Sequence, residues 1–100
     1  MAVQLIITYD ITAPETYAKY NPGSLEGIVQ TLTKHGGEIV VAEKDSEYLT
    51  GEAKDMTIAL RFSDADAAKA WHEDPEYLPY RALRLASTDN ITAIIANEVG

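Results

Sequence analysis

Residues 62–86 read FSDADAAKAWHEDPEYLPYRALRLA, and this stretch decides the fold. Ser63 or Asp64 stands where a side-chain cap begins a helix, and Asp66 lies in the first turn, where the helix dipole favours a carboxylate. The residues that recur at helical spacing and predict a buried face are Ala65, Ala68 and Trp71. A second, short helix is predicted from Pro75 to Leu85, because proline suits the first position of a helix. Pro79 argues against an unbroken helix over this range.

Upstream, residues 2–9 are β-branched and aromatic, which predicts a strand. A helical turn over 14–20 ends before Asn21-Pro22-Gly23, because a residue preceding proline avoids the α region. A longer helix then ends at Gly36-Gly37, since glycine accepts a left-handed backbone. Its predicted apolar stripe consists of Leu25, Ile28, Val29 and Leu32.

Three further strands are predicted at residues 38–43, 56–62 and 91–96. The polar connection 44–54 is expected to contain a short extended piece ending at Gly51. The resulting order, β-α-β-β-α-β, is the split βαβ arrangement of the ferredoxin-like fold, an α+β class with an antiparallel sheet. At this length we expect a single domain over residues 1–100.

Alternation along the strands divides the sheet into two faces. One row is apolar and predicts the core under the helices: Val3, Leu5, Ile7 and Tyr9, then Met56, Ile58, Leu60 and Phe62, then Ile91, Ala93 and Ile95. The other row is half-polar: Gln4, Ile6 and Thr8, then Thr57, Ala59 and Arg61, then Thr92, Ile94 and Ala96. A half-polar face favours coverage by the sheet of a second subunit, which predicts a homodimer; the alternative is a monomer whose face meets solvent.

The composition excludes several classes of protein. Sixteen acidic residues against eight basic ones give a net charge of −8, which argues against binding to nucleic acid or anionic lipid. With no cysteine, the chain has no disulfide, thiolate metal site or thiol nucleophile. The N-terminus lacks the pattern of a signal peptide and no apolar run is long enough to span a membrane, so we expect a cytoplasmic protein.

Six tyrosines against one phenylalanine suggest positions where one end of the ring must reach water or a hydrogen-bond partner. Tyr17 and Tyr20, beside the broken first helix, are candidates for the mouth of a cleft, although boundary packing also explains them. His72 is next to two acidic residues and, with Tyr20, is a weak catalytic candidate, although the pattern favours a solvated histidine. Neither a metal site nor a cofactor is predicted, because the chain has no phosphate-binding glycine loop and too few ligands.

Arg61 falls on the half-polar face, where a covered guanidinium needs an anion. That anion is either a carboxylate of the second subunit or a small organic acid. The predicted ligand-binding residues are therefore Arg61, Tyr17, Tyr20, Trp71 and Arg84.

The order and spacing of several motifs resemble the bacterial domain of unknown function 1330. They are YDITAPETYAKY at 9–20, KHGG at 34–37, Gly51, MTIALRF at 56–62 followed by Ser63, the helix reaching Trp71, DPEY at 74–77 and Arg84. The resemblance implies a homodimeric α+β barrel with a small-molecule pocket between sheet and helices, and no particular reaction. The chain departs from the family pattern at Arg61, where members tend to carry an acid, and in its short connection 44–54.

Three functions are compatible with these features. The first is a homodimer that binds or transforms a small organic acid. The second is a structural or adaptor dimer without a ligand. The third, by analogy of fold alone, is a cofactor-independent monooxygenase or isomerase.

Overall fold

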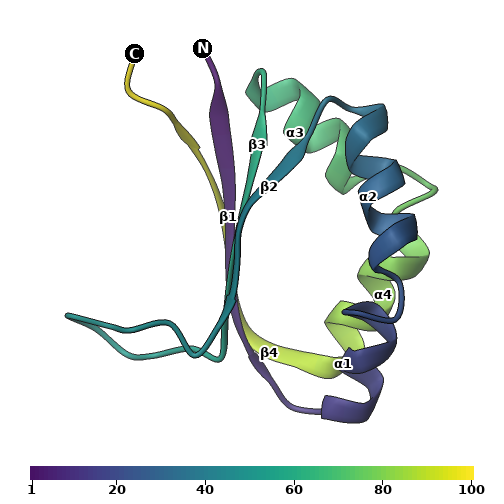
Figure 1. Ribbon diagram of the computed structural model, residues 1–100, viewed down its shortest axis with the longest axis vertical. Coiled ribbons are helices and arrows are strands. Elements are labelled where there is room, and N and C mark those ends of the chain that lie inside the picture. Colours follow the sequence, from purple (N-terminus) through teal and green to yellow (C-terminus); the bar gives the residue numbers. More distant parts are fainter.

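The computed structural model describes residues 1–100 and shows a four-stranded antiparallel sheet with helices on one face only (Figure 1). The strands are β1 (Val3–Ile11), β2 (Glu38–Lys44), β3 (Met56–Phe62) and β4 (Thr88–Asn97). The helices are α1 (Pro14–Tyr20), α2 (Leu25–Lys34), α3 (Ala65–His72) and α4 (Leu78–Ser87). The strand order β2-β3-β1-β4 confirms the predicted ferredoxin-like βαββαβ fold. No helix is both long and apolar enough to cross a membrane.

The core lies between the helices and the two central strands. The predicted inner rows of β1 and β3 are buried, with 9% exposure or less at each position: Val3, Leu5, Ile7, Tyr9, Met56, Ile58, Leu60 and Phe62. Trp71 on α3 is 1% exposed, and its indole N–H donates to Thr31 Oγ1 at 2.9 Å. Its ring centroid lies 4.0 Å from that of Tyr77 and 5.9 Å from that of Phe62. The stretch 62–86 therefore supplies much of the layer that packs on the sheet.

Two sets of residues predicted to be buried are exposed. Ile91, Ala93 and Ile95 of β4 are exposed, with exposed fractions of 38% and 37% for the two isoleucines, because β4 is an edge strand and the helices cover the centre of the sheet. Leu25 and Val29 of α2 are 41% and 40% exposed, although Ile28 and Leu32 of the same stripe are buried. The prediction was wrong at these five positions because hydrophobic periodicity does not show which elements stand at an edge.

The final helix also differs from its prediction. α4 begins at Leu78, with Pro79 near its first position, whereas residues 75–77 form a turn. In this turn the backbone N–H of Glu76 donates to Asp74 Oδ1 at 2.8 Å, and that of Tyr77 donates to the Asp74 carbonyl at 2.8 Å. Pro79, not Pro75, therefore occupies the position where a helix needs no N–H.

The second face of the sheet carries no helix, and we call it the open face. The registers Gln4↔Arg61, Ile6↔Ala59 and Thr8↔Thr57 between β1 and β3 confirm the predicted outer rows. The β1–β4 register adds Thr92, Ile94 and Ala96 to the same face. The connection 45–55 forms no strand and projects as an arm toward the open-face side (Figure 1), so the predicted extended piece is absent.

Asp74 links the turn before α4 to the end of α2. Its side chain is 4% exposed and lies 2.6 Å from His35 Nε2 and 2.9 Å from Lys34 Nζ. These contacts, with the hydrogen bond to His35 the strongest influence, hold the pKa of the Asp74 carboxyl well below its ordinary value. His35, at the C-terminus of α2, thus contacts a carboxylate from a distant part of the chain.

Replacing Asp74 by Asn is expected to lower the urea midpoint of unfolding at neutral pH. A carboxyl with a depressed native pKa contributes stability above its unfolded pKa of about 4, and that contribution is lost as the pH falls toward the native value. The difference between wild type and Asp74→Asn should therefore narrow on acidification below about pH 4. Glu52→Gln, in the exposed arm, is the control. A difference that stays constant with pH would show that the carboxylate charge is not what stabilises this turn.

Candidate functional site

Four tyrosines from three parts of the chain surround one arginine between the sheet and the helices. Tyr9 comes from β1, Tyr17 and Tyr20 lie on one face of α1, and Tyr77 immediately precedes α4. The Tyr9 and Tyr17 hydroxyls lie 2.7 Å apart, and the Tyr20 and Tyr77 hydroxyls lie 2.8 Å apart. We call this group the tyrosine cage.

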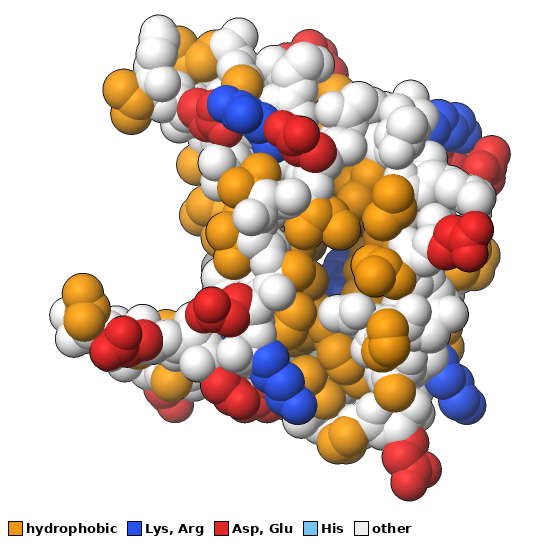
Figure 2. Space-filling view, viewed as in Figure 1, with side chains coloured by type: hydrophobic (Ala, Val, Ile, Leu, Met, Phe, Trp, Pro, Cys, Tyr) orange, Lys and Arg blue, Asp and Glu red, His pale blue; other side chains and the backbone are white.

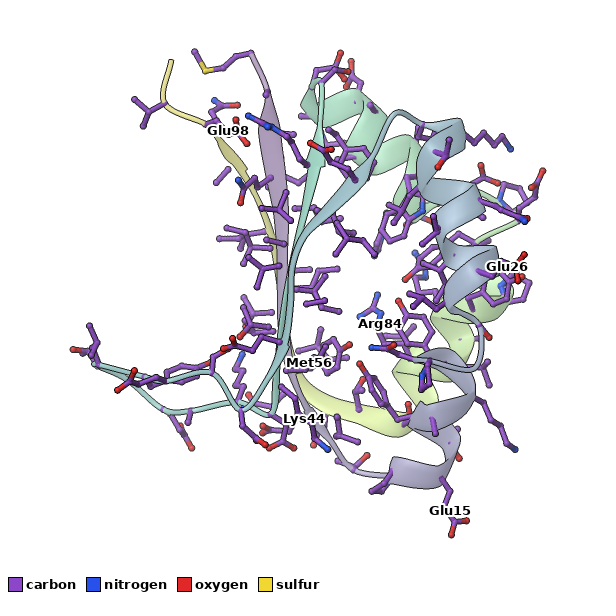
Figure 3. All side chains as sticks on the ribbon, viewed as in Figure 1. Glu15, Glu26, Lys44, Met56, Arg84 and Glu98 are labelled. Carbon is purple, nitrogen blue, oxygen red and sulfur yellow. The ribbon has the colours of Figure 1, made fainter.

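Arg84 of α4 points into the space between the helices and the sheet (Figure 3). The residue is 2% exposed, and its guanidinium carbon lies 5.8 Å from the centroid of the Tyr9 ring. Its Nε atom is buried without a hydrogen-bond partner. No carboxylate forms an ion pair with it, although the chain carries sixteen acidic residues. A buried guanidinium without an anion is costly, so this arrangement is unusual.

Arg84 keeps its charge, and Tyr9 and Tyr20 keep their hydroxyl protons, at neutral pH. Burial, the largest influence, acts to lower the pKa of Arg84, and its net rise comes mainly from the charge that the oxygens of Tyr77 and Tyr20 carry when they are ionised. Burial, followed by the hydrogen bond to Tyr17, raises the pKa of Tyr9. Burial and the neighbouring Tyr77 likewise raise the pKa of Tyr20 well above its ordinary value. Each hydroxyl pair uses one O–H for its internal bond and leaves the other free to donate. The cage therefore offers several donors and a positive charge.

A cavity of about 230 Å³ adjoins the cage. Tyr20 and the buried Trp71 both belong to its wall. The remaining lining is apolar except for Asn21: Ile7, Leu25, Ile28, Leu32, Ile39, Ala42, Ile58 and Leu60. Figure 2 shows a hollow ringed by hydrophobic side chains with a basic side chain at its floor, where Figure 3 labels Arg84. Leu25 and Ile39 are 41% and 40% exposed, so the rim of the cavity is apolar as well.

The structure brings four of the predicted ligand-binding residues to this region: Tyr17, Tyr20, Trp71 and Arg84. It does not bring Arg61 there. Arg61 lies on the open face, where its Nη2 is 2.5 Å from Glu98 Oε1 and its Nη1 is 3.7 Å from Glu38 Oε1. The carboxylates beside Arg61 in this structure thus belong to the same chain.

His72 lies beside a different hollow, of about 190 Å³, between α3 and β4. Its ring contacts Glu73 and Arg81, whose Nη1 also donates to the His72 carbonyl at 2.9 Å. Burial, and then the charge of Arg81, lowers the pKa of His72. The two residues predicted as weak catalytic candidates, Tyr20 and His72, therefore line separate hollows.

The sequence patterns did not indicate Tyr9 and Tyr77 as residues of this site. Tyr9 belonged to the predicted core row of β1, and Tyr77 to the DPEY turn. The excess of tyrosine over phenylalanine was the available signal, because a ring that is fully buried yet kept as a phenol implies a partner for its hydroxyl. No group of three or more His, Asp or Glu side chains is arranged to hold a metal ion.

Solved structures with the same fold come from several bacteria. A protein of unknown function from Rhodopseudomonas palustris has a TM-score of 0.79 at 16% identity, over 99% of this chain and 83% of its own. A dimeric ferredoxin-like protein of unknown function from Jannaschia sp. has a TM-score of 0.75 at 11% identity, over 98% and 100%. SnoaB, a cofactor-independent oxygenase from Streptomyces nogalater, has a TM-score of 0.65 at 13% identity, over 99% and 94%. At such identities the likeness concerns the fold alone.

No curated protein matches the chain in sequence. A family model does: residues 3–98 match the domain of unknown function DUF1330. This match spans the sheet, the four helices and every residue of the tyrosine cage. The chain therefore belongs to the DUF1330 family, which its sequence motifs resemble.

Proposed function

We propose that this protein binds a small organic acid, with the acid group on Arg84 and the apolar body in the adjoining cavity. The observation that carries the proposal is the buried, unpaired guanidinium inside a ring of hydroxyl donors. A site with donors and a positive charge but no acidic group is complementary to an anion. The tyrosine hydroxyls add hydrogen bonds that a carboxylate or another oxyanion accepts.

The size of the cavity limits the ligand. An apolar cavity of about 150 Å³ is already large enough for benzene. At about 230 Å³, this cavity accommodates one ring or a short branched chain next to the acid group. Pockets of this kind combine an apolar wall with few convergent polar groups, and the present site fits that description.

Hexanoate and hexanamide provide a direct test because they share one carbon skeleton and differ in charge. The chain's single tryptophan, Trp71, lines the cavity and reports binding by its fluorescence. Hydrogen bonds to charged groups contribute about 1.5–3 kcal/mol, so hexanoate should bind at least about tenfold more tightly than hexanamide. Equal affinities would contradict an anion site at Arg84, and the absence of binding by either compound would contradict a pocket for such acids.

We also propose that the protein is a homodimer joined through its open faces. The face carries Ile6 and Ile94 among polar side chains, and Ile94 is 50% exposed. Stacking of two such sheets buries these side chains, which a domain of this size does not cover by itself. The dimeric protein from Jannaschia supports this assembly. The cavity opens on the other side of the sheet, so the dimer leaves it accessible.

A further inference from the structure

A second hollow continues the cavity toward the base of the arm. It is a groove of about 560 Å³ between α1 and the end of β2. Asn21 and Ala42 line both the cavity and the groove, so the two spaces meet at these residues. Tyr17 of the cage lines the groove, whereas Tyr20 lines the cavity. Both hollows therefore adjoin the tyrosine cage around Arg84, although the arginine itself is in neither lining.

The chemistry of the lining changes along this path. The cavity is almost wholly apolar, whereas the groove also carries Lys44 and Asp55. Asp55 Oδ2 already accepts a hydrogen bond from the backbone N–H of Ile11 at 2.8 Å. Lys44, in contrast, forms no ion pair. The far end of the groove thus offers an unused ammonium donor.

The position of Lys44 determines how long a ligand must be to reach it. Ala42 pairs with Ile58 and Lys44 pairs with Met56, so both side chains lie on the helix-facing side of β2. Two residues along a strand span about 7 Å. Figure 3 shows Lys44 and Met56 near the base of the arm, below Arg84 in this view. The backbone of Lys44 therefore lies about 7 Å along β2 from the junction at Ala42.

We propose that the natural ligand is an elongated acid with a second acidic or carbonyl group, which passes the junction at Ala42 and ends at Lys44. The inference rests on the proposed function, because the first acid group occupies Arg84. It assigns Lys44 as the residue that selects ligands by length. Ala42, between the two spaces, needs its small side chain to leave the passage open.

Two matched series of probes test this assignment by Trp71 fluorescence: hexanoate, octanoate and decanoate, and the dicarboxylates adipate, suberate and sebacate. At the length that spans the site, the dicarboxylate should bind about tenfold more tightly than its monocarboxylate, a difference of about 1.4 kcal/mol. Lys44→Ala should remove that preference and leave hexanoate affinity unchanged. Lys19→Ala, a lysine of α1 outside both linings, should preserve the preference.

Ala42→Leu provides an independent variant: because Ala42 lines the cavity as well as the groove, a larger side chain there should weaken the long dicarboxylates by a larger factor than it weakens hexanoate. If hexanoate binds but no dicarboxylate binds more tightly than the monocarboxylate of the same length, the proposal of a ligand with two acidic ends is wrong, whereas the anion site at Arg84 is retained. A preference that survives Lys44→Ala overturns the role of Lys44. Absence of hexanoate binding overturns the site and the extension together.

Discussion

Arg84→Met is expected to abolish the binding of organic acids and, at the same time, to make the protein more stable. Methionine is flexible and apolar, so it fills the volume of the arginine stem without a charge. The guanidinium that it replaces is 2% exposed and has neither an ion pair nor a partner for its Nε atom. Leaving a buried polar group unsatisfied costs roughly 1–3 kcal/mol, which the substitution relieves.

The two effects have different sizes and different measurements. In a domain of this length, a gain of 1 kcal/mol raises the melting temperature by about 4–8 °C, which calorimetry resolves. Truncating one partner of a buried charge pair typically costs 2–5 kcal/mol of binding, so hexanoate affinity should fall at least about thirtyfold. A site that holds an unpaired charge for function is expected to sacrifice stability in this way.

Arg81→Met is the matched control on the same helix. Arg81 is ion-paired with Glu73 at 2.9 Å and contacts His72, so it lies beside the separate hollow at α3 and β4. Its replacement should leave hexanoate affinity unchanged and should not stabilise the protein. If Arg84→Met destabilised the fold and binding persisted, Arg84 would be a structural residue and the anion site would be elsewhere.

Ile94→Arg is expected to convert the dimer into a folded monomer. Ile94 stands on the open face of β4, opposite Ile6 on the neighbouring strand β1. If two sheets stack through this face, an arginine at position 94 is buried without an anion to pair with. The two-fold symmetry of the dimer places one such arginine in each subunit, so the cost is incurred twice. Loss of a central contact of this kind costs about 2 kcal/mol or more, so the dimer dissociation constant should rise at least about thirtyfold. Light scattering across a concentration series measures this constant.

Leu85→Arg controls for the new charge, because Leu85 is 49% exposed on α4, close to the 50% of Ile94, but lies on the helical layer. This variant should remain dimeric. Wild-type protein that is monomeric at every concentration would refute the stacked-sheet assembly, as would an Ile94→Arg variant that still dimerises normally. Because the cavity opens on the other side of the sheet, monomeric Ile94→Arg should still bind hexanoate.

Local patterns in the sequence were sufficient to predict the elements of the fold. Alternating apolar residues predicted β3 at its observed bounds, and the pair of glycines predicted the end of α2, where Gly36 has a φ of +70°. Asp64 caps α3 by accepting a hydrogen bond from the Ala67 N–H at 2.8 Å, as one of two candidates. These features depend on contacts within a few residues, so a single sequence contains the necessary information.

The sequence also placed Tyr17, Tyr20, Trp71 and Arg84 among the ligand-binding residues, but it gave most weight to Arg61. The alternation of residues along β3 indicated that Arg61 lies in a half-polar row and needs an anion. That alternation does not show that Glu98, which is distant in the sequence, lies beside Arg61 in the fold. Ile91 and Ile95 were misjudged for the same reason, since an edge strand and a central strand have similar sequences.

What the sequence by itself determined about this protein is its order of strands and helices, its family and the two rows of its sheet. Only the tertiary structure decided that Arg84 has no carboxylate partner and that Tyr9 and Tyr77 join its cage. Whether the charge of Arg84 is paired depends on which side chains come within a few ångströms of it, and those from β1 and α1 are more than sixty positions away in the sequence. That proximity follows from the packing of α1 and α4 over β1, which no local pattern of residues encodes.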